Sequence, residues 1–189
     1  MQLNLIPSDQ DVISDHYLHY KSLNKRLLKY ADTCDYGMSY KPNIWGKHTG
    51  WHVYSPEIAV VHRWIKTCIL TCMKKLNEQY WKDLGWKFLE TWFSRYDEGD
   101  NARPHRHFPN MFGWVYFVKT PKGSSPFVFT YSDTKIEAEE GKIIIFPASM
   151  VHNVPRNNCK DRVVLAGNIG SLLPNPNRKS LSQKLGYSK

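Results

Sequence analysis

Apolar side chains in the front half of the chain recur at intervals of three and four residues, which is the spacing of an amphipathic helix. They predict one helix over residues 9–30 and a second over residues 55–80, which opens with a serine, a proline and a glutamate. Residues 31–54 contain three glycines and a proline, so they are predicted to be loop with short extended pieces. Both helices show a core-facing stripe and no candidate chemistry.

From Trp86 onward the hydrophobic period changes to two, which is the period of a half-buried strand. Strands are predicted over residues 86–96, 112–118, 126–131, 143–146 and 162–169. Short strands separated by turns favour an antiparallel sandwich or barrel. Helices followed by strands favour an α+β fold in which the helices pack on one face of the β core. We therefore expect one domain over residues 1–189, made of a helical lead-in (1–85), a β core (86–173) and a basic, flexible tail (174–189).

Composition narrows the class of protein. Of the 189 residues, 41% are hydrophobic, which is too many for a disordered chain. No apolar run approaches the roughly 20 residues that a membrane span needs, and the N-terminus does not resemble a signal peptide. We therefore expect a cytoplasmic protein whose four cysteines are reduced. The formal charge is +9, of which the tail supplies +4, so the tail either aids solubility or attracts nucleic acid weakly.

Three histidines in the β core are candidate metal ligands. His105 and His107 are separated by one residue, so on an extended chain both imidazoles face the same side. His152 follows the buried strand predicted at residues 143–146. Imidazole is a common ligand of iron, zinc, copper and nickel. The pattern therefore predicts a metal site formed by His105, His107 and His152.

Arg162 is the candidate ligand for an anion. It lies ten residues after His152, at the start of a strand on which Val164, Ala166 and Asn168 share its face. A buried arginine on a small, apolar face is unfavourable unless it meets an anion, and a carboxylate is its natural bidentate partner. Each feature alone is weak, but together they predict a metal site beside a carboxylate site.

Residues 92–169 resemble the iron(II)- and 2-oxoglutarate-dependent oxygenases. The matching segments are WFSRYDEGDNARPHRHFPNMFGWVYFV, GKIIIFPASMVHNVP and DRVVLAGNI. Small oxygenases of bacteriophages and marine bacteria are nearest in pattern, and prolyl hydroxylases are more distant. The resemblance implies a double-stranded β-helix (a jelly-roll or cupin-like barrel) that holds Fe(II) and uses 2-oxoglutarate and O2. A phage-encoded member would work in the cytoplasm of its host.

The resemblance also implies roles for single residues. His105 and His152 match the two histidines of the family's metal site, and His107 stands where the family has Asp or Glu. Arg162 matches the residue that pairs with the far carboxylate of 2-oxoglutarate. The family's serine two residues after that arginine is absent, because Val164 stands there.

Three further residues are candidate contacts of the cosubstrate. Either Tyr96 or Tyr116 matches the positions from which a tyrosine hydroxyl often assists in the family. Asn168 is a third candidate, because it is predicted on the same strand face as Arg162.

The histidine at position 107 leaves alternatives open. Imidazole in place of a carboxylate raises the net charge at the metal by one unit. A cupin-type protein that binds nickel, zinc or manganese without 2-oxoglutarate chemistry is therefore the second hypothesis, although no glutamate follows the two histidines as in cupins. Asp97, Glu98 or Asp100 could supply a carboxylate from the preceding loop. A third hypothesis is a non-catalytic module that binds a partner.

The substrate is expected to be a side chain of a protein or peptide, by resemblance to prolyl hydroxylases. Nucleic acid is the second expectation, supported by the charge of +9. Against nucleic acid, Asn168 stands where nucleic-acid oxygenases carry a second arginine. Arg103, predicted on the face of His105 at the mouth of the barrel, and Trp92 are the candidate substrate contacts.

Overall fold

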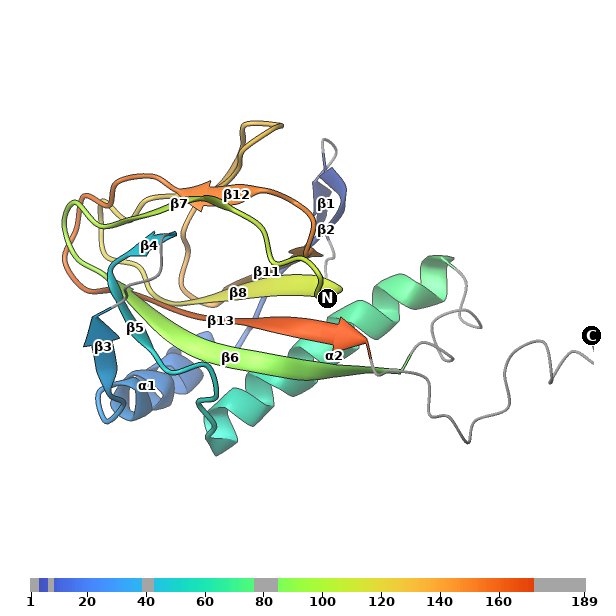
Figure 1. Cartoon of the computed structure of the whole chain (residues 1–189). Helices are drawn as coiled ribbons and strands as arrows, with labels where there is room; N and C mark the ends of the chain where they lie inside the picture. Colours follow the sequence, from blue (N-terminus) through green and yellow to red (C-terminus); the bar gives the residue numbers. More distant parts are fainter. Residues whose placement is uncertain (1–3, 7–8, 39–42, 77–84, 172–189) are drawn as a thin grey trace, which may run out of the picture.

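The computed structural model describes residues 4–6, 9–38, 43–76 and 85–171 (Figure 1). Its helices are α1 (Tyr20–Ala31) and α2 (Pro56–Leu76). The strands before residue 85 are β1 (Asn4–Ile6), β2 (Asp9–His16), β3 (Tyr36–Met38), β4 (Ile44–Trp45) and β5 (Lys47–Thr49). The later strands are β6 (Trp86–Tyr96), β7 (Asn101–His105), β8 (Phe112–Lys119), β9 (Phe127–Phe129), β10 (Thr134–Ile136), β11 (Lys142–Pro147), β12 (His152–Val154) and β13 (Arg162–Ser171). The basic tail and the predicted helix end beyond Leu76 lie outside the described residues.

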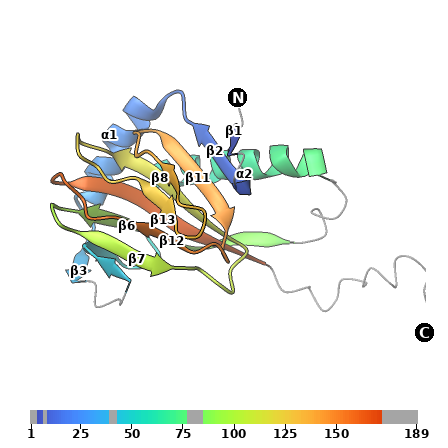
Figure 2. The ribbon, with the colours of Figure 1, turned by 90° about the horizontal axis from the view of Figure 1, so that it is seen from above.

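The strands form two sheets that face each other. The major sheet has the order β1-β2-β11-β8-β13-β6-β5-β3, and the minor sheet has the order β10-β9-β12-β7-β4. Both helices pack on the side of the major sheet that faces away from the minor sheet (Figures 1 and 2). The expected α+β fold, a double-stranded β-helix with helices on one face, is therefore confirmed.

Side chains alternate along β13 between two hydrophobic cores. Val163 and Leu165 join the core under the helices, together with Leu23 and Leu27 of α1. Val164 faces the second core, which lies between the two sheets. Because the strand period is two, Arg162 at the start of β13 points to the same side as Val164, into the barrel.

The first predicted helix, over residues 9–30, is a strand in its first part, contrary to the prediction. Residues 9–16 form β2, which pairs with β11 so that Ile13 lies opposite Ile145. Val12 contributes to the core between the sheets and Ile13 to the core under the helices. The helix α1 begins only at Tyr20. Val12 and Ile13 thus bury opposite faces of one strand, and the helical spacing of apolar residues holds only from α1 onward.

The strands predicted in the second half are confirmed as β6, β8, β9, β11 and β13 within a few residues, although β9 is shorter than expected. The structure adds β7, β10 and β12, each of three to five residues, all in the minor sheet. Two of these short strands, β7 and β12, carry histidines of the candidate site.

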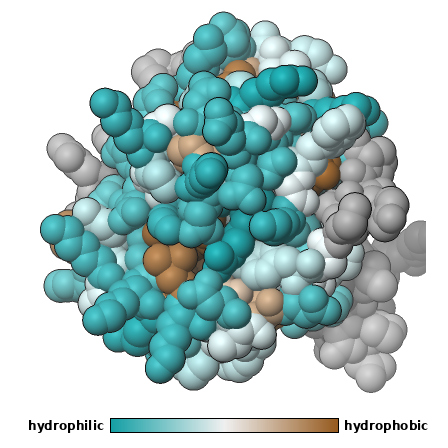
Figure 3. Space-filling model, turned by 90° about the vertical axis from the view of Figure 1, so that its left-hand side faces the viewer, coloured by the Kyte–Doolittle hydropathy of each residue, from teal (hydrophilic) through white to brown (hydrophobic). Residues whose placement is uncertain are grey.

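Neither helix of the described part combines the length and the apolar character that crossing a membrane requires. The end of the molecule at the left of Figure 1 has a mostly hydrophilic surface with small, separate hydrophobic patches (Figure 3). Among the described residues visible in this view, the hydrophobic patches are not joined into one broad area.

Candidate metal centre

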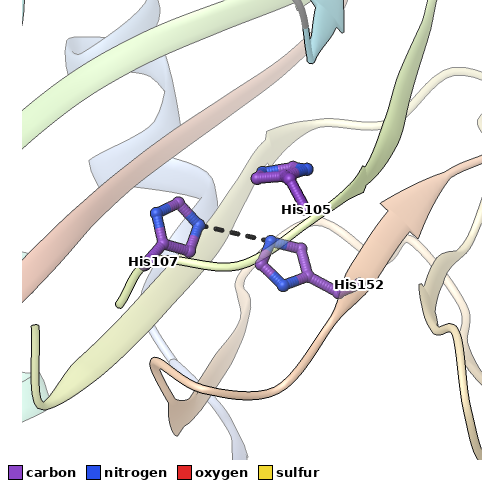
Figure 4. A group of neighbouring side chains, drawn as sticks. All are labelled: His105, His107 and His152. Carbon is purple, nitrogen blue, oxygen red and sulfur yellow. Dashed lines mark hydrogen bonds between the residues drawn. The ribbon is translucent and has the colours of Figure 1, made fainter. Parts of the chain in front are cut away.

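Three imidazoles converge at one end of the minor sheet (Figure 4). His105 ends β7, His107 follows two residues later, and His152 begins β12 directly opposite His105. One ring nitrogen from each histidine lies within 4.8 Å of the others. The Nε2 atoms of His107 and His152 are 3.3 Å apart. Two nitrogens bound to one metal ion lie roughly this far apart, since each metal–nitrogen bond is about 2.1 Å long.

Backbone carbonyls fix the orientation of two of the rings. His105 Nδ1 lies 2.7 Å from the carbonyl oxygen of Arg103, and His152 Nδ1 lies 3.1 Å from that of Met150. Because a carbonyl oxygen only accepts, each Nδ1 is the donor and carries the proton. Each Nε2 is then left with a free lone pair, which is the form that binds a metal.

Burial keeps the three histidines neutral. It lowers the pKa of His105 and His152, and it lowers the pKa of His107 to about 4. The positive charge of one imidazolium beside another lowers the pKa of His107 and His152 further. Near pH 7 all three rings are neutral, and a neutral imidazole keeps one nitrogen lone pair, so the donor set fits a divalent metal.

Arg162 lies in the same cavity as the histidines. It is only 1% exposed, and its Nε and Nη1 atoms have no hydrogen-bond partner among the described residues. Its guanidinium lies 4.9 Å from the ring centre of Tyr96 and 5.6 Å from that of Phe117. A buried guanidinium with unpartnered donors fits a ligand that carries a carboxylate.

The cavity is narrow, with a volume of about 40 Å³. Trp92 and Tyr96 line it, as the sequence predicts. Sequence reasoning missed a further lining residue, Ser94. Trp114 borders the cavity, but its side chain packs in the core under the helices, against His62 and Phe88, and its buried Nε1 has no hydrogen-bond partner among the described residues. The period of two along β6 could have indicated Ser94, because it lies between Trp92 and Tyr96 on the same face. Apolar side chains complete the wall: Ile44, Ala102, Val115, Phe127, Val154, Val164 and Ala166.

Two predicted contacts of the cosubstrate do not reach the cavity. The hydroxyl of Tyr116 donates to Asn24 Oδ1 at 2.6 Å, under the helices, because Val115 takes the inward position on β8. Asn168 Nδ2 donates to the Glu90 carboxylate. Six residues along a strand span about 20 Å, which places Asn168 far from Arg162.

Arg103 does not share the inward face of His105, contrary to the prediction. A bulge in β7 pairs His105 with His152 but Ala102 with Val154, so three residue steps on β7 match two on β12. Ala102 and His105 therefore both face the cavity, and Arg103 between them is exposed.

The acidic loop before the motif supplies no metal ligand among the described residues. The Asp97 carboxylate accepts from Lys47 Nζ at 3.3 Å and from the backbone amide of Asp161 at 3.1 Å. The Asp100 carboxylate accepts from the backbone amide of Asp97. In the described part of the chain, the cluster that could hold a metal consists of the three histidines.

A family model described as aspartyl/asparaginyl beta-hydroxylase matches residues 14–169, which include every residue that lines the cavity. The chain belongs to this family. It is an iron(II)- and 2-oxoglutarate-dependent hydroxylase, an oxidoreductase that uses O2, as the resemblance implies. The alternatives of a cupin without 2-oxoglutarate chemistry and of a non-catalytic module are not supported.

Solved structures share the fold of this hydroxylase. The viral collagen prolyl hydroxylase of Paramecium bursaria Chlorella virus-1, solved with 2-oxoglutarate, has a TM-score of 0.66 and 14% identity, and the match covers 84% of this chain and 95% of that chain. A prolyl-4-hydroxylase of Pseudomonas putida has a TM-score of 0.65 and 14% identity over 86% of this chain and 94% of that chain.

A prolyl hydroxylase of Trichoplax adhaerens, solved with a peptide fragment of hypoxia inducible factor, has a TM-score of 0.61 and 12% identity over 84% of this chain and 83% of that chain. At such identities the likeness concerns the fold alone. None of the curated proteins that were compared matches this hydroxylase significantly.

Proposed function

We propose that this hydroxylase acts on a side chain of a protein or peptide. The family's description names aspartyl and asparaginyl residues. Structures with the same fold include prolyl hydroxylases, one of them bound to a peptide fragment. The observation that carries the chemistry is the cavity in which three neutral imidazoles face one buried, unpartnered guanidinium.

In this proposal His105, His107 and His152 hold Fe(II), and Arg162 holds the far carboxylate of 2-oxoglutarate. Iron and 2-oxoglutarate, when bound, supply the oxidising chemistry with O2: one oxygen atom enters a C–H bond of the substrate, and 2-oxoglutarate leaves as succinate and carbon dioxide. Three protein ligands leave further positions on the metal for the co-substrates. The apolar wall excludes water from the reacting atoms.

Tyr96 has two roles in the proposal. Its ring supports the Arg162 guanidinium from one side, at 4.9 Å. Burial raises the pKa of Tyr96, so its hydroxyl stays protonated and can donate to a carboxylate in the cavity. Trp92 lies beside the metal ligands, 6.1 Å from the ring of His107, and forms part of the pocket wall for the substrate.

An open groove of about 380 Å³ lies beside the cavity and shares Ala102 and Val154 with it. Arg103, whose guanidinium lies 5.0 Å above the ring of the exposed Trp45, and Arg156 both line this groove. In the part of the chain that is described, neither arginine has an ion-pair partner. We therefore propose that a substrate with an acidic residue near its target places that residue in the groove.

The second candidate substrate and the location of the protein are also proposals. Nucleic acid is the second candidate substrate, favoured by the charge of +9 and by the fold shared with NgTET1, which was solved in complex with 5mC DNA and has a TM-score of 0.58 at 11% identity. A cytoplasmic location is also proposed, and the four free cysteines support it.

The test is formation of succinate in air from Fe(II), 2-oxoglutarate and a panel of candidate substrates. Peptides centred on Asp, Asn or Pro are offered with and without a neighbouring acidic residue, and single-stranded oligonucleotides form the second arm. We expect an acidic peptide to stimulate succinate formation and to gain the mass of one oxygen atom, with His152→Ala as the inactive control. Stimulation by oligonucleotides and by none of the peptides would reverse the choice of substrate class.

A further inference from the structure

We infer that iron and 2-oxoglutarate bind to this hydroxylase as a strongly coupled pair, because the described residues bring no negative charge to their cavity. The inference rests on the proposed roles of His105, His107, His152 and Arg162. It concerns how much each ligand depends on the other, which the roles alone do not determine.

In the described part of the chain, every side chain that lines the cavity is either neutral or positively charged. The metal donors are three imidazoles, and neither an aspartate nor a glutamate is among the lining residues. Arg162 is the charged residue of the wall, and no described carboxylate pairs with it. The nearest acidic loop uses Asp97 and Asp100 in contacts with Lys47 and with backbone amides. The wall therefore carries a net charge of +1.

A divalent metal that enters this cavity alone meets unfavourable electrostatics. It adds two positive charges beside a buried guanidinium, and charges of like sign repel strongly where water is excluded. In the usual triad of two histidines and one carboxylate, the carboxylate offsets one of those charges. His107 provides a neutral donor at that position, so the metal alone is retained weakly.

The cosubstrate supplies the missing charge. 2-Oxoglutarate carries two negative charges, of which one end pairs with Arg162 and the other chelates the metal in the proposed site. The cavity with the metal alone carries +3, and with both ligands it carries +1. Each ligand therefore makes binding of the other more favourable, and the factor is the same in both directions by thermodynamic linkage. We expect a factor of about 100, near the upper end of ordinary couplings.

Two variants at one position separate charge from chelation. His107→Asp and His107→Asn have side chains of nearly the same size, each with an oxygen donor, and they differ by one negative charge. The dissociation constant of Co(II) is measured for the wild type and both variants, with and without saturating 2-oxoglutarate. Quenching of Trp92, which lines the cavity beside His107, gives the signal, and calorimetry confirms it.

The coupling factor is the ratio of the two dissociation constants for each protein. We expect the factor of His107→Asn to stay within about threefold of the wild-type value, and that of His107→Asp to be at least about tenfold lower. The decrease should come from tighter binding of Co(II) to His107→Asp when 2-oxoglutarate is absent. Equal factors in the Asp and Asn variants would mean that chelation alone couples the ligands, and would overturn the inference.

Failure of the proposed function would look different. A wild-type protein that binds no Co(II) would overturn the metal site and, with it, the inference. A wild-type protein that binds Co(II) with an affinity independent of 2-oxoglutarate would keep the metal site and overturn both the proposed cosubstrate site and the inference. Circular dichroism checks that the variants fold. If those at position 107 do not, the same Asp and Asn pair at His105 is measured, and the same difference of tenfold or more is required.

Discussion

At the scale of single residues, Arg162 places a charge inside the barrel at the expense of stability. Its guanidinium is 1% exposed and packs over the rings of Tyr96 and Phe117. Removing an ion from water into a protein interior is unfavourable by several kcal/mol, and contacts with aromatic rings return about 2 kcal/mol at most. Its presence there fits the proposed role in binding 2-oxoglutarate, as in other sites where function opposes stability.

Replacing Arg162 by an uncharged side chain of similar length tests whether its buried charge lowers the stability of the ligand-free protein. Arg162→Met should raise the free energy of unfolding of the ligand-free protein by about 1–3 kcal/mol, because an unpaired buried charge is removed and the apolar contacts are kept. Arg162→Lys keeps the charge and should bring no gain. Urea denaturation measures all three proteins, and a clearly destabilised Met variant would refute the unpaired charge.

His62 of α2 gives a prediction for pH. Its ring stacks on Phe88 at 3.9 Å and contacts the Thr91 hydroxyl at 3.0 Å. Burial lowers its pKa from 6.5 to about 4. The folded protein therefore holds a neutral imidazole where the unfolded chain gains a proton, so the stability from this residue is complete above pH 6.5 and is lost as the pH falls toward 4.

The measurement is the free energy of unfolding of the metal-free wild type and of His62→Gln as a function of pH. Gln does not titrate, so the stability advantage of the wild type should shrink by about 2 kcal/mol between pH 7 and pH 4.5. An advantage that stays constant over this range would show that His62 titrates normally in the folded protein.

At the scale of elements, β8 separates the chemistry from the support. Val115 faces the cavity, and Tyr116 faces the helices, where its hydroxyl bonds to Asn24 of α1. Asn24 also donates to the carbonyl oxygen of Val118 at 2.7 Å, so one buried side chain joins α1 to β8 by two hydrogen bonds. The helix therefore fixes the outer face of the sheet whose inner face forms the cavity.

Two tyrosine variants test this separation by the same chemical change. Tyr116→Phe leaves the buried Asn24 oxygen unpaired, so it should lower the free energy of unfolding by about 1–2 kcal/mol and leave 2-oxoglutarate affinity unchanged. Tyr96→Phe removes a hydroxyl inside the cavity and should weaken 2-oxoglutarate binding several-fold. Calorimetry of 2-oxoglutarate with each variant decides, and weaker binding by Tyr116→Phe would contradict the placement of that side chain.

The sequence was sufficient for the elements and residues whose pattern is local. The period of two gave β6, β8 and β13, and the spacing of His105, His107, His152 and Arg162 predicted side chains that the fold brings into one cavity. Features that depend on pairing between strands could not be read in this way. The bulge that turns Arg103 outward exists only against β12, and residues 9–16 become a strand only because β11 offers them an edge.

At the scale of the whole molecule, the site joins the two sheets. The minor sheet positions His105 and His152, two of the proposed metal ligands, and the major sheet presents Arg162 from β13 across the barrel. A dicarboxylate bound at both ends therefore contacts both sheets, and its binding stabilises their closed arrangement by linkage. The fold thereby turns two weak local features, a pair of histidines and a buried arginine, into one site.

The central claim is that the three imidazoles and Arg162 hold Fe(II) and 2-oxoglutarate together in this cavity. Anaerobic titration of the protein with both ligands, followed by visible absorption, tests it most directly. The account predicts a weak charge-transfer band in the wild type, no band in His152→Ala, and a band in Arg162→Met only at much higher 2-oxoglutarate. A wild type without the band at saturating Fe(II) and 2-oxoglutarate, or an Arg162→Met variant that titrates like the wild type, would contradict it.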